Sequence, residues 1–455
     1  MRSSDLTSIA MTTTSSAIPT ATPPAPGSGS GHERGTPGYR RLGAAMWCAG
    51  LATFVLVYCV QALLPTLASE FRLSSSTSSL ALSATTGALA LAVVPLSTLA
   101  ESWGRVRVMT IALATTAVLG VLAPLAPNFP ALVGIRALQG VAIAALPALA
   151  MAHMTREVAP RWLGSAVGLL IAGNTLGGLS GRLIAGAVAD VAGWRIALAV
   201  IGVLSIGCTV AFRLLLPPAL TEPPPRVRFR ELGALTRVHL RDPGLLCLFG
   251  IGFLLMGAFV TVYNYLGFRL LAAPFDLPPQ IVGLVFLGYI AGTWASTTAG
   301  RLGDRIGRRR VLWGAVLVGV LGAWVTVPDH LLAVLAGLLL VTVGFFGAHS
   351  LASSWVGRRA TLMPGGSPGV ASSLYLFAYY AGSSIGGTLG GIAFDRAGWL
   401  GVVIYVSVLL VAALGLALWL RRIPAPTAPA EPDRRGTPIR SGPTSSCPGF
   451  LGGYR

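Results

Sequence analysis

The chain contains twelve mainly apolar stretches of about 20 residues, separated by short loops. A helix needs about 20 apolar residues to cross roughly 30 Å of hydrocarbon, and lipid cannot satisfy the hydrogen bonds of an irregular backbone. The sequence therefore predicts an all-α integral membrane protein with twelve transmembrane helices. These helices are expected at residues 43–66, 79–99, 106–126, 129–152, 163–189, 195–216, 244–267, 280–300, 310–327, 331–354, 367–393 and 398–420.

The charges of the chain are few and unevenly placed. Charged residues make up 11% of the sequence, whereas soluble domains carry about 25%. The 33 basic residues exceed the 15 acidic ones, which in a soluble protein would suggest a nucleic-acid partner. With a cytoplasmic N-terminus, however, seventeen loop arginines lie inside, and only Arg72, Arg195, Arg269 and Arg396 lie outside. This positive-inside bias predicts that both termini are cytoplasmic. It argues against a nucleic-acid partner and indicates that the basic residues contact the anionic lipids of the bilayer.

The two halves of the chain repeat each other. The stretch Glu101–Val108 corresponds to Asp304–Val311, at an offset of 203 residues. We therefore expect two six-helix bundles related by a pseudo-twofold axis along the membrane normal, with a solute path between them. The other segments are polar or rich in proline and arginine, and the tails are expected to be disordered. The expected domains are an N-terminal cytoplasmic tail at 1–42, bundles at 43–216 and 244–420, a cytoplasmic interdomain loop at 217–243, and a C-terminal cytoplasmic tail at 421–455.

One loop carries a family signature. Residues 300–309 match the pattern G-x-x-x-D-R-x-G-R-R at every fixed position, which are Gly300, Asp304, Arg305, Gly307, Arg308 and Arg309. A degraded copy after the second helix keeps Gly104 and Arg105, with Glu101 in place of the aspartate. The chain thereby resembles the major facilitator superfamily. Shorter stretches at 49–54, 58–61, 348–350 and 372–377 resemble its YnfM-type or acriflavine-sensitivity family, whose members are regarded as small-molecule exporters.

The signature loop and its degraded copy are expected to act as a cytoplasmic latch. The glycines let helices approach closely, the acid can bind an exposed helix N-terminus, and the arginines can form charge-assisted hydrogen bonds to the opposite bundle. Such contacts would exist in one access state only. The alternative is a basic inner loop without a gating role.

Two residues are candidates for coupling transport to protons. Arg136 begins the segment Arg136–Gly140, which resembles the R-x-x-Q-G motif of the superfamily, whose arginine is associated with proton coupling. An arginine inside a helix usually faces a cavity or a partner, although it can also snorkel to the interface. All fifteen acids fall in tails, loops or helix ends, so His349 is the titratable group left inside a helix. Its alternative role is a hydrogen bond between helices.

The fifth helix carries glycines at every fourth position, Gly173, Gly177 and Gly181. This spacing fits the antiporter motif of the superfamily, except that Gly178 and Arg182 stand where the motif has its proline and its last glycine. Close packing of two helices would use the same spacing. The spacing alone leaves both explanations open.

The solute path is expected to be amphipathic and weakly basic. In the superfamily, helices 1, 5, 7 and 11 line the path, so polar and aromatic residues on these helices are the main candidates, together with the embedded arginine of helix 5 and the glutamine of the helix 4 motif. The candidate cavity residues are Tyr58, Gln61, Gln139, Asn174, Arg182, Tyr263, Asn264, Tyr379 and Tyr380.

These features favour a secondary transporter. The leading hypothesis is export of a small neutral or anionic solute by alternating access and proton antiport, carried out by a monomeric multi-pass protein of a bacterial cell membrane. An uptake symporter or a facilitator without proton coupling is the alternative, and a non-transporting membrane sensor is a third hypothesis. The chain shows no nucleophile–base pair, metal cluster or phosphate-binding loop. We therefore expect neither an enzyme nor a metal or cofactor.

Overall fold

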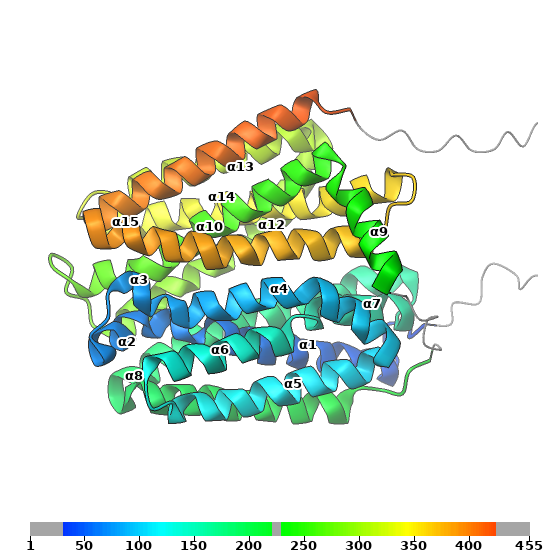
Figure 1. Ribbon diagram of the computed structural model, residues 1–455, viewed down its shortest axis with the longest axis horizontal. Coiled ribbons are helices and arrows are strands. Elements are labelled where there is room, and N and C mark those ends of the chain that lie inside the picture. The colour runs from blue at the N-terminus through cyan, green and yellow to red at the C-terminus, as the bar shows by residue number, and fades with distance from the viewer. Residues whose placement is uncertain (1–30, 221–228, 425–455) are drawn as a thin grey trace, which may run out of the picture.

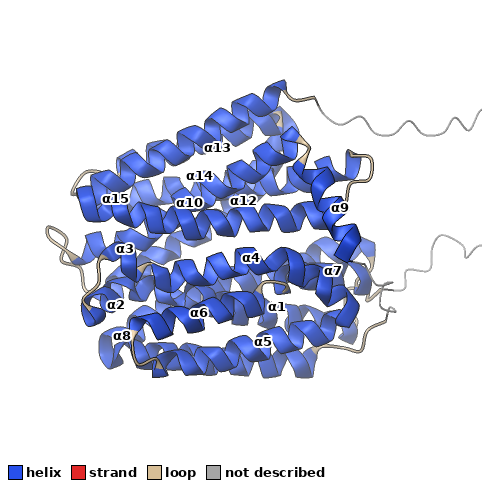
Figure 2. Cartoon of the chain, in the orientation of Figure 1, coloured by secondary structure: helices blue, strands red, loops and turns tan. Residues whose placement is uncertain are grey.

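The computed structural model describes residues 31–220 and 229–424, apart from the side chains of 98–102 and 229–231. The regular elements of these residues are helices, as Figure 2 shows. Most of the predicted tails and the centre of the predicted interdomain loop lie outside the described residues. At two places a helix occupies residues that were predicted to be tail or loop. The first helix begins at Pro37, inside the predicted tail, because the Thr36 side chain caps its first turn. A helix, α9 (Phe229–Leu240), occupies part of the predicted loop.

The N-terminal half is built from eight α-helices and three short 3₁₀ turns. Its first membrane helix is a composite in which a 3₁₀ turn, η1, interrupts the regular hydrogen bonding between α1 and α2. The elements are α1 (Pro37–Tyr58), η1 (Cys59–Leu63), α2 (Leu64–Phe71), α3 (Ser75–Ser78), α4 (Leu80–Trp103), α5 (Arg105–Leu122), η2 (Ala123–Leu125), α6 (Phe129–Ile143), α7 (Leu146–Glu157), η3 (Pro160–Trp162) and α8 (Leu163–Leu215).

The C-terminal half follows α9 and has a similar plan. Its elements are α10 (Pro243–Leu271), α11 (Pro279–Leu284), η4 (Val285–Gly288), α12 (Tyr289–Ile306), α13 (Arg308–Val325), α14 (Leu331–Leu362), α15 (Pro368–Trp419) and η5 (Leu420–Arg422). In Figure 1 the two halves lie side by side, with their helices running in roughly the same direction.

Nine helices of the described residues are long and apolar enough to cross a membrane. Two of the nine are unusually long: α8 has 53 residues and α15 has 52. Each is interrupted by a glycine with positive φ, Gly193 at 83° and Gly398 at 59°. The helix α13 is not among the nine and begins with three arginines. Twelve spans would require α8 and α15 each to cross twice and α13 to cross once.

Two ends of the molecule are distinguished by the chain termini. We call the end where α1 begins and η5 finishes the tail end, and the opposite end, where α2 and α3 lie, the far end (Figure 1). The helix α9 crosses the tail end from the C-terminal half toward α7 (Figure 1). The buried residue His239 anchors it there, because the His239 Nε2 atom accepts a hydrogen bond from the Ser367 N–H at 3.1 Å.

The glycines at every fourth position of α8 form a close contact with α1. A Cβ atom on Gly173, Gly177 or Gly181 of α8 would lie within 3.0 Å of backbone atoms of α1. Glycines of α15, including Gly382 and Gly386, approach the backbone of α10 in the same way. Small residues thus let these helices approach closely, and the antiporter motif stays a prediction.

A buried ion pair joins α10 and α14 at the tail end. The guanidinium of Arg359 donates to both carboxylate oxygens of Asp242, at 2.6 and 2.9 Å, and the Asp242 carboxylate also caps α10 by accepting from the Leu245 N–H. The side chains are 6% and 13% exposed. Burial raises the pKa of Asp242, but the hydrogen bonds from Arg359 and from the Leu245 N–H outweigh it, so this pKa lies below its usual value.

We expect Asp242→Asn to lower the free energy of unfolding by about 3 kcal/mol, because it leaves the buried Arg359 without a carboxylate. The test is thermal unfolding of the purified protein in detergent. Because the folded pKa of Asp242 is lowered, its contribution should be present above about pH 4 and fall as the pH drops through the lowered pKa. The control is Asp304→Asn, whose exposed pair with Arg308 should contribute less than about 1 kcal/mol. Equal losses in both variants would contradict this assignment.

Candidate solute site and gate

A buried arginine lies where the two halves meet. Arg182 of α8 is 1% exposed. Its Nε donates to the Gln61 Oε1 atom at 2.6 Å, its Nη1 to the Gly178 carbonyl at 2.6 Å, and its Nη2 to the Tyr289 hydroxyl of α12 at 3.1 Å. None of the ion pairs among the described residues involves Arg182. The guanidinium therefore has neutral hydrogen-bond partners and has N–H groups beyond these three bonds.

Gln61 connects this arginine to the other half. Its Nε2 atom donates to the Asn264 Oδ1 atom of α10 at 2.7 Å. Gln61 and Asn264 are 203 residues apart, which is the offset between the signature loop and its copy, so the bond joins equivalent positions of the two halves. The Asn264 Nδ2 atom is buried and has no hydrogen-bond partner among the described residues. The site thus contains a cation and an unused neutral donor.

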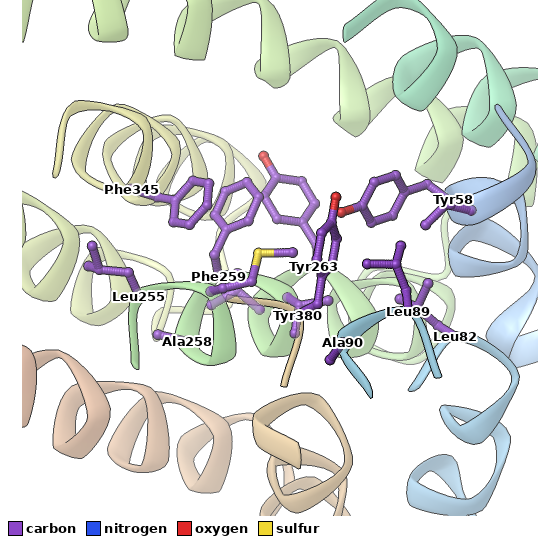
Figure 3. Packing of buried hydrophobic residues seen from close by; sticks show 14 of the residues in the cluster. Tyr58, Leu82, Leu89, Ala90, Leu255, Ala258, Phe259, Tyr263, Phe345 and Tyr380 are labelled. Carbon is purple, nitrogen blue, oxygen red and sulfur yellow. The ribbon is translucent and has the colours of Figure 1, made fainter. Parts of the chain in front are cut away.

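Aromatic rings surround the Arg182 guanidinium. Its carbon lies 4.3 Å from the ring centroid of Tyr58, 4.5 Å from that of Tyr289 and 5.1 Å from that of Phe286. These distances are in the range of cation–π attraction. Tyr263 packs at 4.7 Å from Tyr289 and bonds the Thr342 hydroxyl at 2.7 Å. In Figure 3, Tyr58 from the N-terminal half reaches toward Tyr263 and Tyr380 of the C-terminal half.

The aromatic wall continues to His349 of α14. Phe259 of α10 stacks on Phe345 at 3.9 Å, and Phe345 stacks on the His349 ring at 5.6 Å. The His349 Nδ1 atom lies 2.9 Å from the Tyr375 hydroxyl, and its ring lies 4.8 Å from Tyr379. Tyr379 in turn packs edge-on against Tyr380 at 5.0 Å. The predicted candidates Tyr58, Gln61, Arg182, Tyr263, Asn264, His349, Tyr379 and Tyr380 therefore belong to one connected cluster, which we call the central cluster.

Arg136 and Gln139 lie apart from the central cluster. Arg136 is 1% exposed and donates to the carbonyls of Ala81, Leu56 and Val57 at 3.0, 2.7 and 2.7 Å. It also donates to the Gln139 Oε1 atom at 2.7 Å. The contacts of Gln139 thus lie inside the N-terminal half, and its predicted role in lining the cavity is not tested by them. Arg136 ties α6 to α4 and to the end of α1, where the 3₁₀ turn leaves carbonyls without their α-helical partners. Its role in proton coupling stays a prediction.

Asn174 of α8 lies on the contact between α8 and α1. A Cβ atom on Gly50 of α1 would collide with its side-chain and backbone atoms. The side chain is half-buried, and its contacts place it in the helix seam of the N-terminal half. Its predicted role in lining the cavity is not tested by these contacts.

The signature residues lie at the tail end, where α12 meets α13. The Asp304 carboxylate is 71% exposed and pairs with Arg308 of the same half at 3.4 Å, and the Arg309 Nη1 donates to the Arg421 carbonyl at 3.4 Å. Arg305 is exposed. Both contacts lie within the C-terminal half. The latch stays a prediction, because the side chains of 98–102 in the degraded copy lie outside the described residues.

The signature glycines act differently from the prediction. A Cβ atom on Gly300 would meet open space, so this glycine does not provide a close helix approach. Gly307 and its counterpart Gly104 have φ angles of 96° and 88°, which residues with side chains rarely adopt. Both form sharp joints between consecutive helices. Next to Gly104, the Arg105 Nη1 donates to the Ala152 carbonyl at 3.3 Å, whereas the side chain of Glu101 lies outside the described residues.

The halves are bonded together at the far end. Besides the contacts of Gln61 and Arg182, the Ser384 hydroxyl donates to the Ser83 carbonyl at 2.8 Å, the Ser76 N–H donates to the Asp395 carboxylate at 3.2 Å, and Gln280 bonds Asp190. A void of about 20 Å³ remains there between Gln61 and Phe286, enough for about one water molecule.

The tail end is more open. A cavity of about 180 Å³ separates α4 and α7 from α15, with Leu232 and Leu235 of α9 in its wall. The hydrogen bonds between the halves named above lie in the central cluster and toward the far end. The structure is therefore closed at the far end and loosely packed at the tail end.

The fold and sequence have clear relatives. The family model described as Major Facilitator Superfamily matches residues 46–360 and 265–448. The chain belongs to the Major Facilitator Superfamily. The inner membrane transport protein YnfM of Escherichia coli is 40% identical over 390 residues, covering 86% of this chain and 93% of that protein. A chloramphenicol efflux pump of Mycobacterium tuberculosis is 27% identical over 338 residues, covering 72% of this chain and 77% of the pump.

Solved structures support the same fold. A bacterial homolog of the human lysosomal transporter Spinster, crystallised in an inward-facing and occupied conformation, has a TM-score of 0.69 and 15% identity, and covers 85% of this chain and 98% of its own. The resemblance to the YnfM-type branch is confirmed by the identity to YnfM. This superfamily member is a multi-pass protein of the bacterial inner membrane and a transporter of small solutes.

Sequence reasoning missed several aromatic residues that pack against the central cluster, among them Phe286 and Tyr289 beside Arg182. Phe286 and Tyr289 flank the Arg182 guanidinium, but they belong to the eighth helix, which was not counted among those that line the path. Their spacing of three residues places two aromatic rings on one helix face. This three-residue spacing is the sequence signal that could have identified Phe286 and Tyr289 as site residues.

Proposed function

We propose that this superfamily transporter exports a small organic solute that carries an aromatic ring and is neutral or anionic. The observation that carries this proposal is the central cluster: a buried arginine without a carboxylate partner, surrounded by aromatic rings at the junction of the halves. A guanidinium favours carboxylates and other electron-rich groups, and the rings favour stacking. A cationic solute would be repelled by Arg182, with no described acid beside it to compensate.

The proposed topology has twelve spans and both termini in the cytoplasm. The kinks at Gly193 and Gly398 support two crossings each for α8 and α15. Arginines are concentrated at the tail end, including Arg213, Arg237, Arg241 and the signature arginines, and the positive-inside rule favours the cytoplasm for that end. In this orientation the closed far end faces the outside and the open tail end faces the cytoplasm. The structure would then be the inward-facing state of a transporter that we propose to be monomeric.

Export by proton antiport is the proposed direction and coupling. The relationship to a chloramphenicol efflux pump supports export. His349 is the proposed proton carrier, because its ring lies in the central cluster and its Nδ1 atom meets a hydroxyl. Uptake or facilitated diffusion without proton coupling is the second candidate. It is favoured by the positions of the acids, because proton-coupled exporters commonly use a carboxylate buried in the membrane. Here the acids Asp190, Asp304 and Asp395 each lie within a few residues of a helix kink or end.

A growth assay tests the proposed export. A strain lacking this gene is compared with the same strain carrying it, across a panel of dyes, aromatic antibiotics and aromatic acids. Export predicts greater tolerance of at least one aromatic compound when the gene is present. Uptake predicts greater sensitivity, or growth on an aromatic acid only when the gene is present.

We expect Asp304→Asn to reduce transport about tenfold or more while the protein stays folded. In the state with a closed tail end, the proposed latch needs the Asp304 charge for contacts with a helix end or an arginine of the opposite half, and in the present state the carboxylate is exposed. Flux and thermal unfolding should be measured on the same preparation. Wild-type flux by this variant would show that the signature aspartate does not serve as a latch.

A further inference from the structure

A further cavity lies outside the central cluster. It has a volume of about 670 Å³ and opens at the tail end, between the ends of α12, α13 and α14. Five arginines line it, Arg308, Arg309 and Arg310 from α13 and Arg358 and Arg359 from α14, together with a single carboxylate, that of Asp304. We call it the arginine pocket. Its volume is typical of a site for a small ligand.

The positive charge of the arginine pocket is only partly compensated. Arg359 is paired with Asp242, and Arg308 with the exposed Asp304. Arg310 and Arg358 form no ion pair among the described residues. The first turn of α13 contains no acidic residue and has no side-chain cap, so the positive end of the helix dipole adds to the arginine charges. An anion in the pocket would relieve this repulsion.

The walls of the pocket also indicate the chemistry of that anion. Arginine forks suit phosphate oxygens, which accept two parallel hydrogen bonds. Ile306 and Leu362 give the pocket an apolar part, and Ile306 and Leu302 on the last turns of α12 are exposed apolar residues, 47% and 40%. A phosphate joined to hydrocarbon chains matches both features. A soluble phosphate would use only the arginines.

We propose that the arginine pocket binds the phosphate of an anionic phospholipid at the membrane surface, with its acyl chains against the apolar residues of α12. Arg310 and Arg358 would hold the phosphate, since they are the lining arginines without an ion pair or carbonyl partner among the described residues. The equivalent of Arg310 in the other half is Arg107, at the offset of 203 residues. Binding at this pocket does not depend on the identity of the transported solute.

Lipid titration of the purified full-length protein tests this site. Native mass spectrometry should be used to compare phosphatidylglycerol with phosphatidylcholine of the same acyl chains. We expect selective binding of phosphatidylglycerol to the wild type and about 25-fold weaker binding to the double variant Arg310→Gln/Arg358→Gln, at roughly fivefold for each arginine. The matched control is Arg107→Gln/Arg213→Gln, which removes two exposed arginines at the tail end of the other half and should bind as the wild type does.

Several outcomes would overturn the proposal. Equal binding of phosphatidylglycerol to the two double variants would mean that the arginine pocket does not hold the lipid. Equal binding of the two lipids to the wild type would exclude recognition of the anionic head group. Inorganic phosphate displacing phosphatidylglycerol at millimolar concentration would reassign the pocket to a soluble phosphate. Thermal unfolding of each variant should match the wild type, because the substituted arginines are exposed.

Discussion

Arg136→Leu is expected to lower the free energy of unfolding by about 3–6 kcal/mol, the largest stability loss of any substitution considered. The Arg136 guanidinium donates to three buried carbonyls, those of Ala81, Leu56 and Val57. The Ala81 carbonyl lies inside α4 and needs no second donor. The Val57 carbonyl, the Gln139 Oε1 atom and the Leu56 carbonyl, which also accepts from the weak S–H donor of Cys59, would each lose a strong donor at a cost of about 1–3 kcal/mol. Leucine fills most of the volume but provides no donor. The measurements are the abundance of folded protein in the membrane and its thermal unfolding in detergent.

Two further variants separate this role from others. Arg136→Lys should be intermediate, because one ammonium keeps the charge and some donors but lacks the planar fork. Arg195→Leu is the matched control, since Arg195 also donates to two carbonyls, of Pro124 and Ala126, but it is exposed and water can replace it. That variant should lose only about 1 kcal/mol. A stable Arg136→Leu protein that has lost only proton-coupled flux would instead support the proton-coupling role.

Arg182→Gln is expected to reduce transport of an anionic aromatic solute by about 10- to 100-fold, the range of one lost charged hydrogen bond. The fold should tolerate the change, because the Gly178 carbonyl that Arg182 contacts lies within a helix, and Gln61 keeps its bond to Asn264. The loss should be largest for anions and smaller for neutral solutes, since the guanidinium charge is removed. Initial rates of flux at matched expression measure this effect.

Two further variants test whether Arg182 itself contacts the solute. Arg182→Lys keeps the charge but not the fork, so it should retain part of the anion flux. Arg195→Gln is the control, because Arg195 lies beyond the Gly193 kink on the same helix and outside the central cluster. If Arg182→Gln and Arg195→Gln transport every solute equally well, Arg182 does not contact the solute.

The helices and the repeat could be predicted from the sequence because both signals are local. Apolar length locates membrane helices, and the signature spacing locates the joint at Gly307. The partners of polar residues could not be predicted in the same way. Helices that are apolar all round give no indication of which face a single arginine occupies. Arg136 and Arg182 therefore looked alike in sequence, yet one bonds carbonyls within a half and the other joins the two halves.

The 3₁₀ turn at η1 explains the difference for Arg136. It creates carbonyls at Leu56 and Val57 that need a donor, and no pattern of apolar residues announces such a turn. The helix α9 was hidden for another reason. Its mixture of basic and apolar residues fits a polar loop in sequence, and its apolar side is recognisable only when Leu232 and Leu235 are seen against the tail-end cavity.

The measurement that tests the proposed function most directly is solute-dependent proton movement in everted membrane vesicles. Respiration establishes a pH gradient, and a solute selected by the growth assay is then added to vesicles with wild-type protein, Arg182→Gln or Arg195→Gln at equal abundance. Antiport through the central cluster predicts that the solute partly dissipates the gradient with wild type and with Arg195→Gln, and does not with Arg182→Gln. Equal dissipation by all three proteins, or none with wild type while the solute still moves, would contradict it.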